Sequence, residues 1–267
     1  MRKIINAHCH IYPADIAARA VAGIENFYDI KIPLNGCTDG LIEDGSKVGV
    51  VHYLVQSVAT KPTQVKSINE FIASEVKKHP GVFTGFGTLH PDSEDVEGDF
   101  KHLMELGLKG VKLHPDFQFF SLEEDRAIRL GQIVRDGGLP ILTHCGDFRY
   151  KLSNPDQLAV FLKALPGLTV IGAHLGGWSV WDEVEAKIAG RFDMYVDTCS
   201  SYRFMENDDA VRLMRKFGTD RVLWGTDYPT WTHESELELF DKLDLTEKER
   251  EQILYGNAAK LLGIEGN

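Results

Sequence analysis

Eight short β-rich segments, each separated from the next by helical pattern, constrain the fold of this chain more than any other feature. They span residues 3–10, 50–58, 82–89, 110–115, 139–145, 168–175, 193–200 and 221–227. Most begin as continuous apolar runs, which is typical of parallel strands covered on both faces. Strand and helix that alternate along a whole chain predict βα units around a parallel sheet. Eight such units predict a closed α/β barrel, the (β/α)8 or TIM barrel, with an open doubly wound sheet as the structural alternative.

The length of 267 residues is normal for one such barrel, which runs to about 250 residues. We find no internal repeat or linker, so residues 1–267 are predicted to form a single domain. The connection 11–49 is unusually long, and long connections in compact domains are usually functional or mobile. We expect it either to cover the active site or to form an elaborated surface loop.

Charge and hydropathy exclude several classes of partner. The net charge of −11, without a Lys/Arg cluster to offset it, disfavours nucleic acid. The N-terminal apolar stretch is broken by Asn6, His8 and His10, so no secretory signal is expected, and no run suits a transmembrane helix. Widely spaced cysteines predict free thiols in a reducing, cytoplasmic compartment: Cys9, Cys37, Cys145 and Cys199. The expected partner is a small-molecule substrate, with no nucleic acid and no membrane.

Histidines and an aspartate stand at the C-terminal ends of several predicted strands. His8 and His10 share one face of the 3–10 segment, because side chains alternate along a strand. His144, His174 and Asp227 stand at the corresponding ends of later segments. The C-terminal rim of an α/β barrel is where its active site lies. We therefore expect these side chains to converge on one small space.

The chemistry of these side chains predicts a metal site. Neutral imidazole and carboxylate bind zinc or similar divalent ions at about 2.0–2.2 Å, and an open coordination position marks a catalytic site. Such an ion lowers the pKa of bound water to about 7, and a nearby carboxylate or imidazole moves protons. A lone histidine at a strand end is more often a hydrogen-bonded core residue, so the prediction depends on the joint pattern.

For the other histidines and for one lysine, the sequence supports a role in the site less strongly. Surface roles are predicted for three histidines in helix ends or loops: His79, His102 and His233. His90 and His114 end strands and are candidates to face the site. Lys112 has three interpretations: a carboxylated lysine that bridges two metals, a partner for a substrate anion, or a member of a structural ion pair.

The motifs together resemble those of the amidohydrolase superfamily, in particular the branch that includes aminocarboxymuconate-semialdehyde decarboxylase and related hydrolases. The matching stretches are INAHCHIYP, GVKLHPDFQFF, LPILTHCGD, LTVIGAHLGG, MYVDTCSS, DRVLWGTDYP and LTEKEREQILYGNAAKLLGI. They span nearly the whole chain in the expected order, whereas residues 11–49 match weakly.

The resemblance implies specific roles for the residues at the rim. His8, His10, His144 and Asp227 would bind one divalent metal ion, with zinc the expected metal and manganese the alternative. His174 would stand close to the metal-bound water and act as base or orienter. The KLHP segment recurs in this branch without a modified lysine, which argues against a bridged metal pair.

Hydrolysis of an amide, ester or lactone bond is the predicted reaction, with Asp227 and His174 as the catalytic pair that accepts and relays the proton of a metal-activated water. The chain has no GxSxG elbow and no Cys–His signature, so covalent catalysis is disfavoured. The alternative is a metal-dependent non-oxidative decarboxylase, a lyase, because the metal ligands do not discriminate the two. A barrel that only binds a ligand or partner is disfavoured, because all the site residues are present.

Side chains near the strand ends are predicted to contact the substrate. These are Lys112, His114, Arg149, Trp178, Arg203 and Tyr228. The alternative for each is a solvated or packing role. A homo-oligomer is compatible with such a barrel, although nothing in the sequence fixes a symmetry.

Overall fold

The computed structural model describes residues 2–264. Its strands are β1 (Ile4–His10), β2 (Val50–Gln56), β3 (Phe83–Gly85), β4 (Gly87–Thr88), β5 (Val111–Leu113), β6 (Ile141–Thr143), β7 (Val170–Gly172), β8 (Tyr195–Asp197) and β9 (Val222–Leu223). Each lies inside one of the eight predicted segments. β3 and β4 are two parts of one strand interrupted at Phe86, whose N–H donates to the Val55 carbonyl at 3.0 Å.

Parallel pairing joins these strands in chain order. β1, β2 and β3 form one run, and β4 to β9 form a second. The segment after β9 returns to β1: the Ala7 N–H donates to the Trp224 carbonyl at 2.8 Å, and the His10 N–H donates to the Tyr228 carbonyl at 2.7 Å. The (β/α)8 barrel predicted from the sequence is therefore the architecture of this chain.

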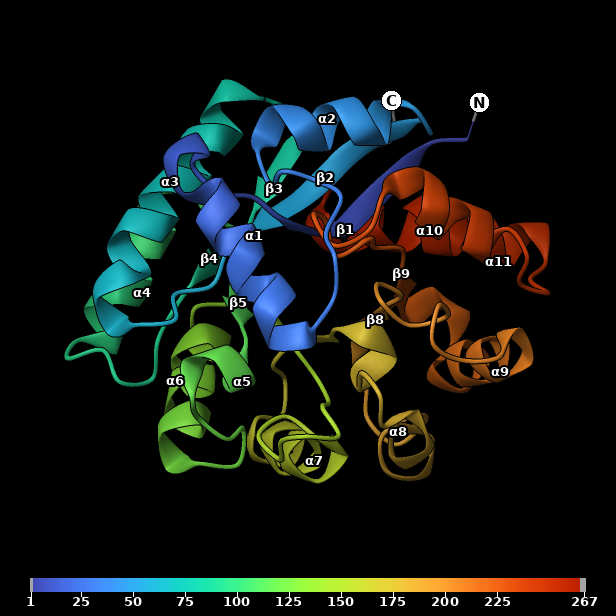
Figure 1. Ribbon diagram of the computed structural model, residues 1–267. Helices are drawn as coiled ribbons and strands as arrows, with labels where there is room; N and C mark the ends of the chain where they lie inside the picture. The colour runs from blue at the N-terminus through green and yellow to red at the C-terminus, as the bar shows by residue number, and fades with distance from the viewer. Residues whose placement is uncertain (1, 265–267) are drawn as a thin grey trace.

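Most of the helices surround the strands, with an exception near the site (Figure 1). They are α1 (Ala14–Tyr28), α2 (Thr38–Ser46), α3 (Val65–Lys78), α4 (Val96–Glu105), α5 (Pro115–Gln118), α6 (Asp125–Asp136), α7 (Pro155–Ala164), α8 (Trp181–Lys187), α9 (Asn207–Phe217), α10 (His233–Phe240), α11 (Glu247–Glu251) and α12 (Asn257–Leu262). The exception is α1, which crosses in front of β4 and β5 instead of joining the outer ring. No helix of residues 2–264 is long and apolar enough to cross a membrane.

Local sequence signals explain where several helices begin. The Asp95 side chain accepts the N–H of Gly98 at 2.8 Å and caps α4. Thr246 and Glu249 form a reciprocal capping box at the start of α11. α7 begins with Pro155, whose fixed φ suits the first helical position.

β1 contains an irregularity that positions the site. Asn6 pairs with Tyr53 and Cys9 with Val55, so β1 carries one more residue than β2 over this stretch, which is the pattern of a β-bulge. Before the bulge, Ala7 packs in an apolar cluster with Leu142, Ile171 and other strand residues. After it, Cys9 packs in the larger cluster that includes helix residues, and His8 and His10 line a cavity.

The larger apolar cluster, between strands and helices, holds the fold together, and Phe161 of α7 is fully buried in it. We expect Phe161→Ala to lower the free energy of unfolding by about 3–5 kcal/mol, through lost burial and the cavity left behind. Val160→Ala, at a 41% exposed neighbour, is the matched control and should change it by less than about 0.5 kcal/mol. Urea unfolding followed by circular dichroism measures both, and equal losses would contradict this view of the core.

Candidate metal centre and active site

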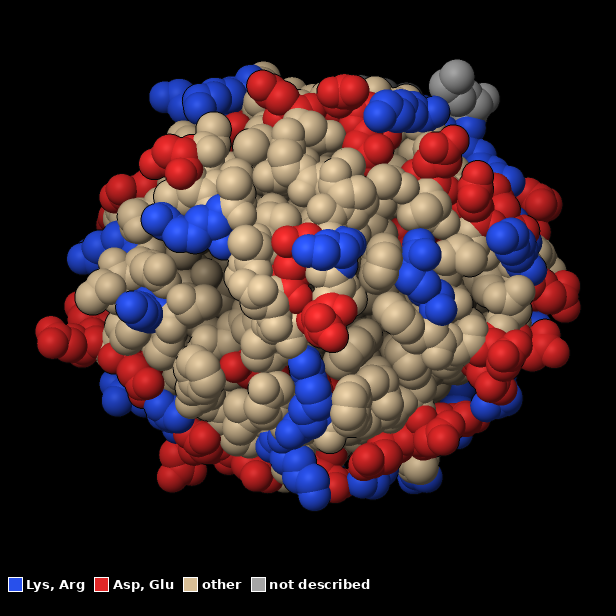
Figure 2. Space-filling view, in the orientation of Figure 1, with Lys and Arg blue, Asp and Glu red and all other residues tan. Residues whose placement is uncertain are grey.

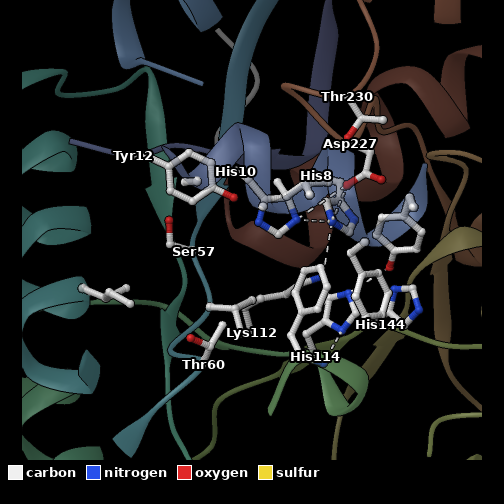
Figure 3. Close-up of a pocket in the computed structure, with 18 of the residues that line it drawn as sticks. His8, His10, Tyr12, Ser57, Thr60, Lys112, His114, His144, Asp227 and Thr230 are labelled. Carbon is white, nitrogen blue, oxygen red and sulfur yellow. Dashed lines mark hydrogen bonds and ion pairs between the residues drawn. The ribbon is translucent and has the colours of Figure 1, made fainter. Parts of the chain in front are cut away.

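Three ligand atoms meet at the C-terminal ends of β1 and β9. The Nε2 atoms of His8 and His10 lie 3.1 Å apart. The Oδ1 atom of Asp227 lies 3.4 Å from the first and 3.6 Å from the second. A tetrahedral ion with bonds of about 2.1 Å would hold its ligand atoms about 3.4 Å from one another. These three side chains, seen together in Figure 3, therefore fit a divalent metal ion.

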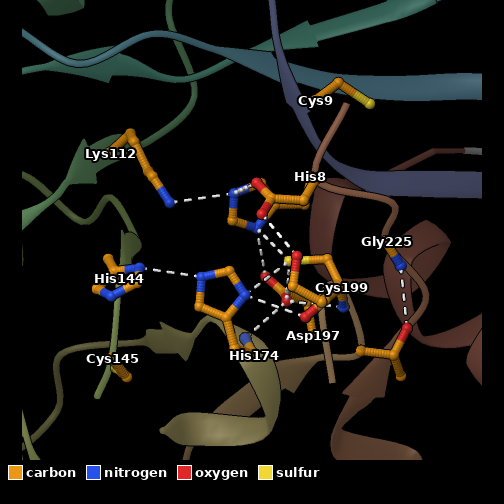
Figure 4. A network of polar contacts seen from close by, with 12 residues as sticks. His8, Cys9, Lys112, His144, Cys145, His174, Asp197, Cys199 and Gly225 are labelled. Atoms are coloured by element: carbon orange, nitrogen blue, oxygen red, sulfur yellow. Dashed lines mark hydrogen bonds and ion pairs between the residues drawn. The ribbon is translucent and has the colours of Figure 1, made fainter. Parts of the chain in front are cut away.

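A buried carboxylate fixes the orientation of His8. The His8 Nδ1–H donates to Asp197 Oδ2 at 2.7 Å, which leaves Nε2 with its lone pair toward the site (Figure 4). Metal-binding histidines are commonly held by a carboxylate in this way. Asp197 also accepts the backbone N–H of His174 at 3.0 Å. Asp197 was not predicted from the sequence as a site residue, although its signal was present: a carboxylate that directly follows the apolar Val196 at the end of a strand.

A second contact chain orients Asp227. The Trp231 indole N–H donates to Ser200 Oγ at 2.9 Å, and Ser200 Oγ lies 2.8 Å from Asp227 Oδ2. Because an indole N–H only donates, the Ser200 hydroxyl is left to donate to Asp227. This contact holds Oδ2, so that Oδ1 faces the two histidines. Ser200 and Trp231 were not assigned from the sequence as supports of the site.

His144 and His174 form a separate pair beside this cluster. His144 Nδ1 and His174 Nε2 lie 3.0 Å apart. Their other nitrogens lie within hydrogen-bond distance of backbone carbonyls, of Gly146 at 2.9 Å and of Cys199 at 3.0 Å. Carbonyls only accept, so the facing nitrogens of the neutral rings both carry lone pairs. Two buried acceptors in contact need a proton or a cation beside them, which fits the predicted metal role of His144 and proton-relay role of His174.

Burial sets the charge of the groups at the site. Burial lowers the pKa of His10, His144 and His174, which favours the neutral imidazoles that bind metals. Burial alone would raise the pKa of Asp227, but the neighbouring histidines outweigh it, and the net pKa lies below the usual value. Burial also lowers the pKa of Lys112, although Asp197 and Asp227 oppose this shift.

A cavity of about 750 Å³ opens above these residues. Its volume lies within the usual range for small-molecule sites. α1 forms much of its wall, so the long 11–49 connection lies over the site. Figure 2 views this face, where acidic and basic side chains lie among uncharged residues across the centre. The lining also contains residues that the sequence analysis did not assign: Tyr12, Ser57, Thr60, Ile68, Phe71, Phe117, Ser200, Phe204 and Thr230.

Three of the six predicted substrate contacts line this cavity: Lys112, His114 and Trp178. The Lys112 Nζ donates to His8 Nε2 at 3.2 Å. His114 stacks on His144, with ring centroids 4.0 Å apart. Their position on the cavity is compatible with substrate contacts, which stay a prediction.

The other three predicted contacts do not line the cavity, and each has a partner within the protein. Arg149 pairs with Asp147 at 2.6 Å. Arg203 pairs with Glu236 at 2.8 Å. Tyr228 is fully buried, and its hydroxyl donates to the Cys37 carbonyl at 2.9 Å. The arrangement does not favour direct substrate contacts for these three.

The predicted surface role of His233 is wrong. His233 is fully buried, and its Nδ1–H donates to Asp44 at 2.7 Å. Its Nε2 accepts from Asn6 Nδ2 at 2.8 Å. Asn6 Oδ1 in turn accepts the backbone N–H groups of His8 at 3.1 Å and Thr226 at 3.2 Å. His233 therefore supports β1, which carries His8, and the segment after β9 that leads to Asp227. Only the packing of α10 on β1 reveals this contact.

A sequence model of the amidohydrolase family matches residues 5–264. The chain belongs to this amidohydrolase family. Its fold is similar to that of an uncharacterized TIM-barrel protein from Bordetella bronchiseptica, at 19% identity, with 98% of each chain covered and a TM-score of 0.78.

Two further solved structures share this amidohydrolase's fold. A dihydroxybenzoic acid decarboxylase from a Polaromonas species, with bound manganese, is 16% identical, covers 100% of this chain and 98% of its own, and gives a TM-score of 0.77. A putative 2-pyrone-4,6-dicarboxylic acid hydrolase from Pseudomonas putida is 18% identical over 100% of both chains, with a TM-score of 0.70. At these identities the likeness concerns the fold alone.

We expect the support of His8 by Asp197 to be measurable as metal affinity. Asp197→Asn should weaken metal binding by about 10–100-fold, because it removes the charge that orients the imidazole and raises its basicity. Asp193→Asn is the matched control, since the Asp193 side chain in the same segment is 83% exposed. Competition with a metal-binding dye gives both affinities, and equal affinities in the two variants would contradict the role of Asp197.

Proposed function

We propose that this amidohydrolase hydrolyses an amide, ester or lactone bond of a small molecule with one divalent metal ion, for which zinc is the first candidate and manganese the second. The observation that carries the proposal is the cluster of His8 Nε2, His10 Nε2 and Asp227 Oδ1, whose mutual distances of 3.1–3.6 Å suit an ion. His144 would add a fourth ligand.

The reaction needs proton transfers that the chain's own residues supply. When bound, the ion provides a Lewis acid that lowers the pKa of water and polarises a carbonyl. Asp227 accepts the proton of the attacking water, and the hydrogen bond from Ser200 to its Oδ2 holds the carboxylate toward the site. His174, with Nε2 toward the site, relays a proton to the leaving group. Lys112 offers a buried ammonium to the developing oxyanion.

The charges around the cavity support hydrolysis of a neutral carbonyl. Among the described lining residues, the only lysine is Lys112 and the only arginine is Arg19, which is an exposed residue of α1. Arg149 and Arg203, the predicted clamps for a substrate carboxylate, pair with Asp147 and Glu236 instead.

A second candidate is a non-oxidative decarboxylase of a small carboxylated substrate. Two observations favour it. Several similar solved structures are decarboxylases, including the manganese-containing example described above. Lys112 also places one buried cation beside His8, where it would pair with a substrate carboxylate.

Metal content and product analysis test the proposal together. Protein purified without chelator or affinity metal should contain about one equivalent of zinc or manganese per chain by elemental analysis. It should then cleave a panel of esters, lactones or amides without releasing carbon dioxide. Carbon dioxide release from a carboxylated ring would favour the lyase instead. Two equivalents of metal would bring Lys112 and His174 into the metal-binding set, and none after metal is added back would overturn the central claim.

A further inference from the structure

The cavity extends well beyond the catalytic groups. Figure 3 shows Tyr12, Ser57 and Thr60 on the far side of His10 and Lys112 from Asp227 and His144. The volume of about 750 Å³ would hold about 25 water molecules, which is far more than an ester or lactone group alone requires. The part of the cavity beyond His10, lined by α1 and α3, is called the arm here.

Regularly spaced apolar side chains form the walls of the arm. Ile16, Ala20 and Ile24 recur on one face of α1, at the spacing of successive helical turns. Ile68 and Phe71 come from one face of α3. The lined face of α1 from Ile16 to Ile24 is about 12 Å long at 1.5 Å per residue. The arm is therefore long, and its apolar side chains are mostly aliphatic, although Asp15 and Arg19 of α1 line the cavity as well.

Small residues on α1 keep the arm open. Gly23 lies on the same lined face, and a Cβ added there would meet no atom within 4 Å. Glycine inside a helix costs about 0.5–1 kcal/mol relative to alanine, so its place on this face needs a reason. Together with Ala20, it leaves room for a ligand where larger side chains would fill the space.

The polar groups near the start of α3 bond to one another. The Thr60 hydroxyl and the Lys61 N–H both donate to Gln64 Oε1, at 3.1 Å and 3.0 Å. The Ser67 hydroxyl donates to the Gln64 backbone carbonyl at 3.1 Å. These groups therefore do not require a polar ligand to satisfy them. The charged lining residues of α1, Asp15 and Arg19, are exposed to solvent, which leaves the apolar side chains to hold an apolar ligand.

We propose that the arm between α1 and α3 binds an unbranched apolar chain, so that the substrate is an ester, amide or lactone of a medium-chain fatty acid. The chain extends from the reacting carbonyl at His8, His10 and Asp227, past Lys112, and along Ile24, Ala20 and Ile16. This inference deepens the proposed function and rests on it only for the position of the carbonyl. A single aromatic ring would leave most of the length of α1 uncovered.

Straight-chain carboxylates from butanoate to decanoate test the arm without any need for turnover. Calorimetric titration of the metal-loaded protein should show the Kd falling by about fourfold for each added CH2 until the arm is filled. Dissociation constants that stay the same across the series would overturn the proposal. Tighter binding of benzoate than of octanoate would overturn the choice of a straight chain over a ring.

Two variants of α1 locate the binding site. Gly23→Leu should narrow the arm and reduce the ratio of the butanoate Kd to the octanoate Kd by about tenfold or more, and the substitution favours the helix. Ala18→Leu is the matched control, because Ala18 is exposed on the same helix and outside the lining, and it should leave the ratio unchanged. A ratio that Gly23→Leu does not change would overturn the proposed location.

Turnover separates this inference from the proposed function. If the titrations show the chain-length dependence but no fatty-acid ester or lactone is cleaved, the hydrolase proposal is contradicted, whereas the proposal that the arm binds an apolar chain is upheld. If short esters are cleaved at the same rate as long ones and the Kd does not depend on chain length, the proposal that the arm binds an apolar chain is contradicted, whereas the hydrolase proposal is upheld.

Discussion

Replacing Asp227 with asparagine is expected to lower kcat/KM by about 10²–10⁴-fold, the usual contribution of a positioned general base. The amide keeps the shape of the side chain but cannot accept the proton of the attacking water. In the unmodified protein the Asp227 Oδ1 atom lies 3.4 Å from His8 Nε2, so the substitution also removes a negative charge from the predicted metal site. Steady-state kinetics on the best ester or lactone substrate measures the loss.

Elemental analysis of the same variant separates the two roles of Asp227. Retained metal with lost turnover points to the proton transfer, and loss of both points to the ligand role. Asp220→Asn, at an exposed position shortly before β9, is the matched control and should behave as the unmodified protein. Unchanged kcat/KM in Asp227→Asn would contradict the proposed mechanism.

The second large effect is expected from His10→Ala. His10 contributes one of the three ligand atoms that meet in the cluster. Its loss should therefore weaken metal binding by more than about 100-fold, the upper end of the effect expected when a supporting contact is removed. Turnover should fall with it to near the background rate. Metal titration and kinetics, each at several metal concentrations, follow both losses.

Loss of the His10 imidazole is not expected to unfold the barrel, since this side chain faces the substrate cavity and not the apolar core. Thermal unfolding of His10→Ala should therefore stay close to that of His79→Ala, a control at the end of α3. Full turnover of His10→Ala at low metal concentration would remove the basis of the metal-dependent mechanism.

Periodicity made the barrel predictable from the sequence. Parallel strands buried on both faces read as apolar runs, and all eight predicted segments contain the strands that were found. The break at Phe86, between β3 and β4, was not predictable, because the residues 82–89 read as one continuous strand. Such a break depends on how neighbouring strands pair, which no local pattern records.

The site was predictable where its residues stand at strand ends and less so where support comes from elsewhere. His8, His10 and Asp227 converge because the barrel topology brings every strand's C-terminal end to one rim. His233 was misjudged because burial of a helical residue depends on what the helix packs against. The aliphatic arm was also missed, since α1 lines the cavity through the placement of a whole helix and not through a motif.

The bulge in β1 gives the first strand a change of phase between its two halves. If the same sequence paired with β2 without the bulge, the side chains that follow Ala7 would exchange inner for outer positions, and Cys9 would take the place of a histidine. Deletion of Ala7 would instead remove the bulge and keep both imidazoles toward the cavity, with the loss of one apolar side chain from the barrel interior. For an engineer who grafts this site onto another barrel, the distance between the apolar half and the histidine half of the strand matters as much as the histidines themselves.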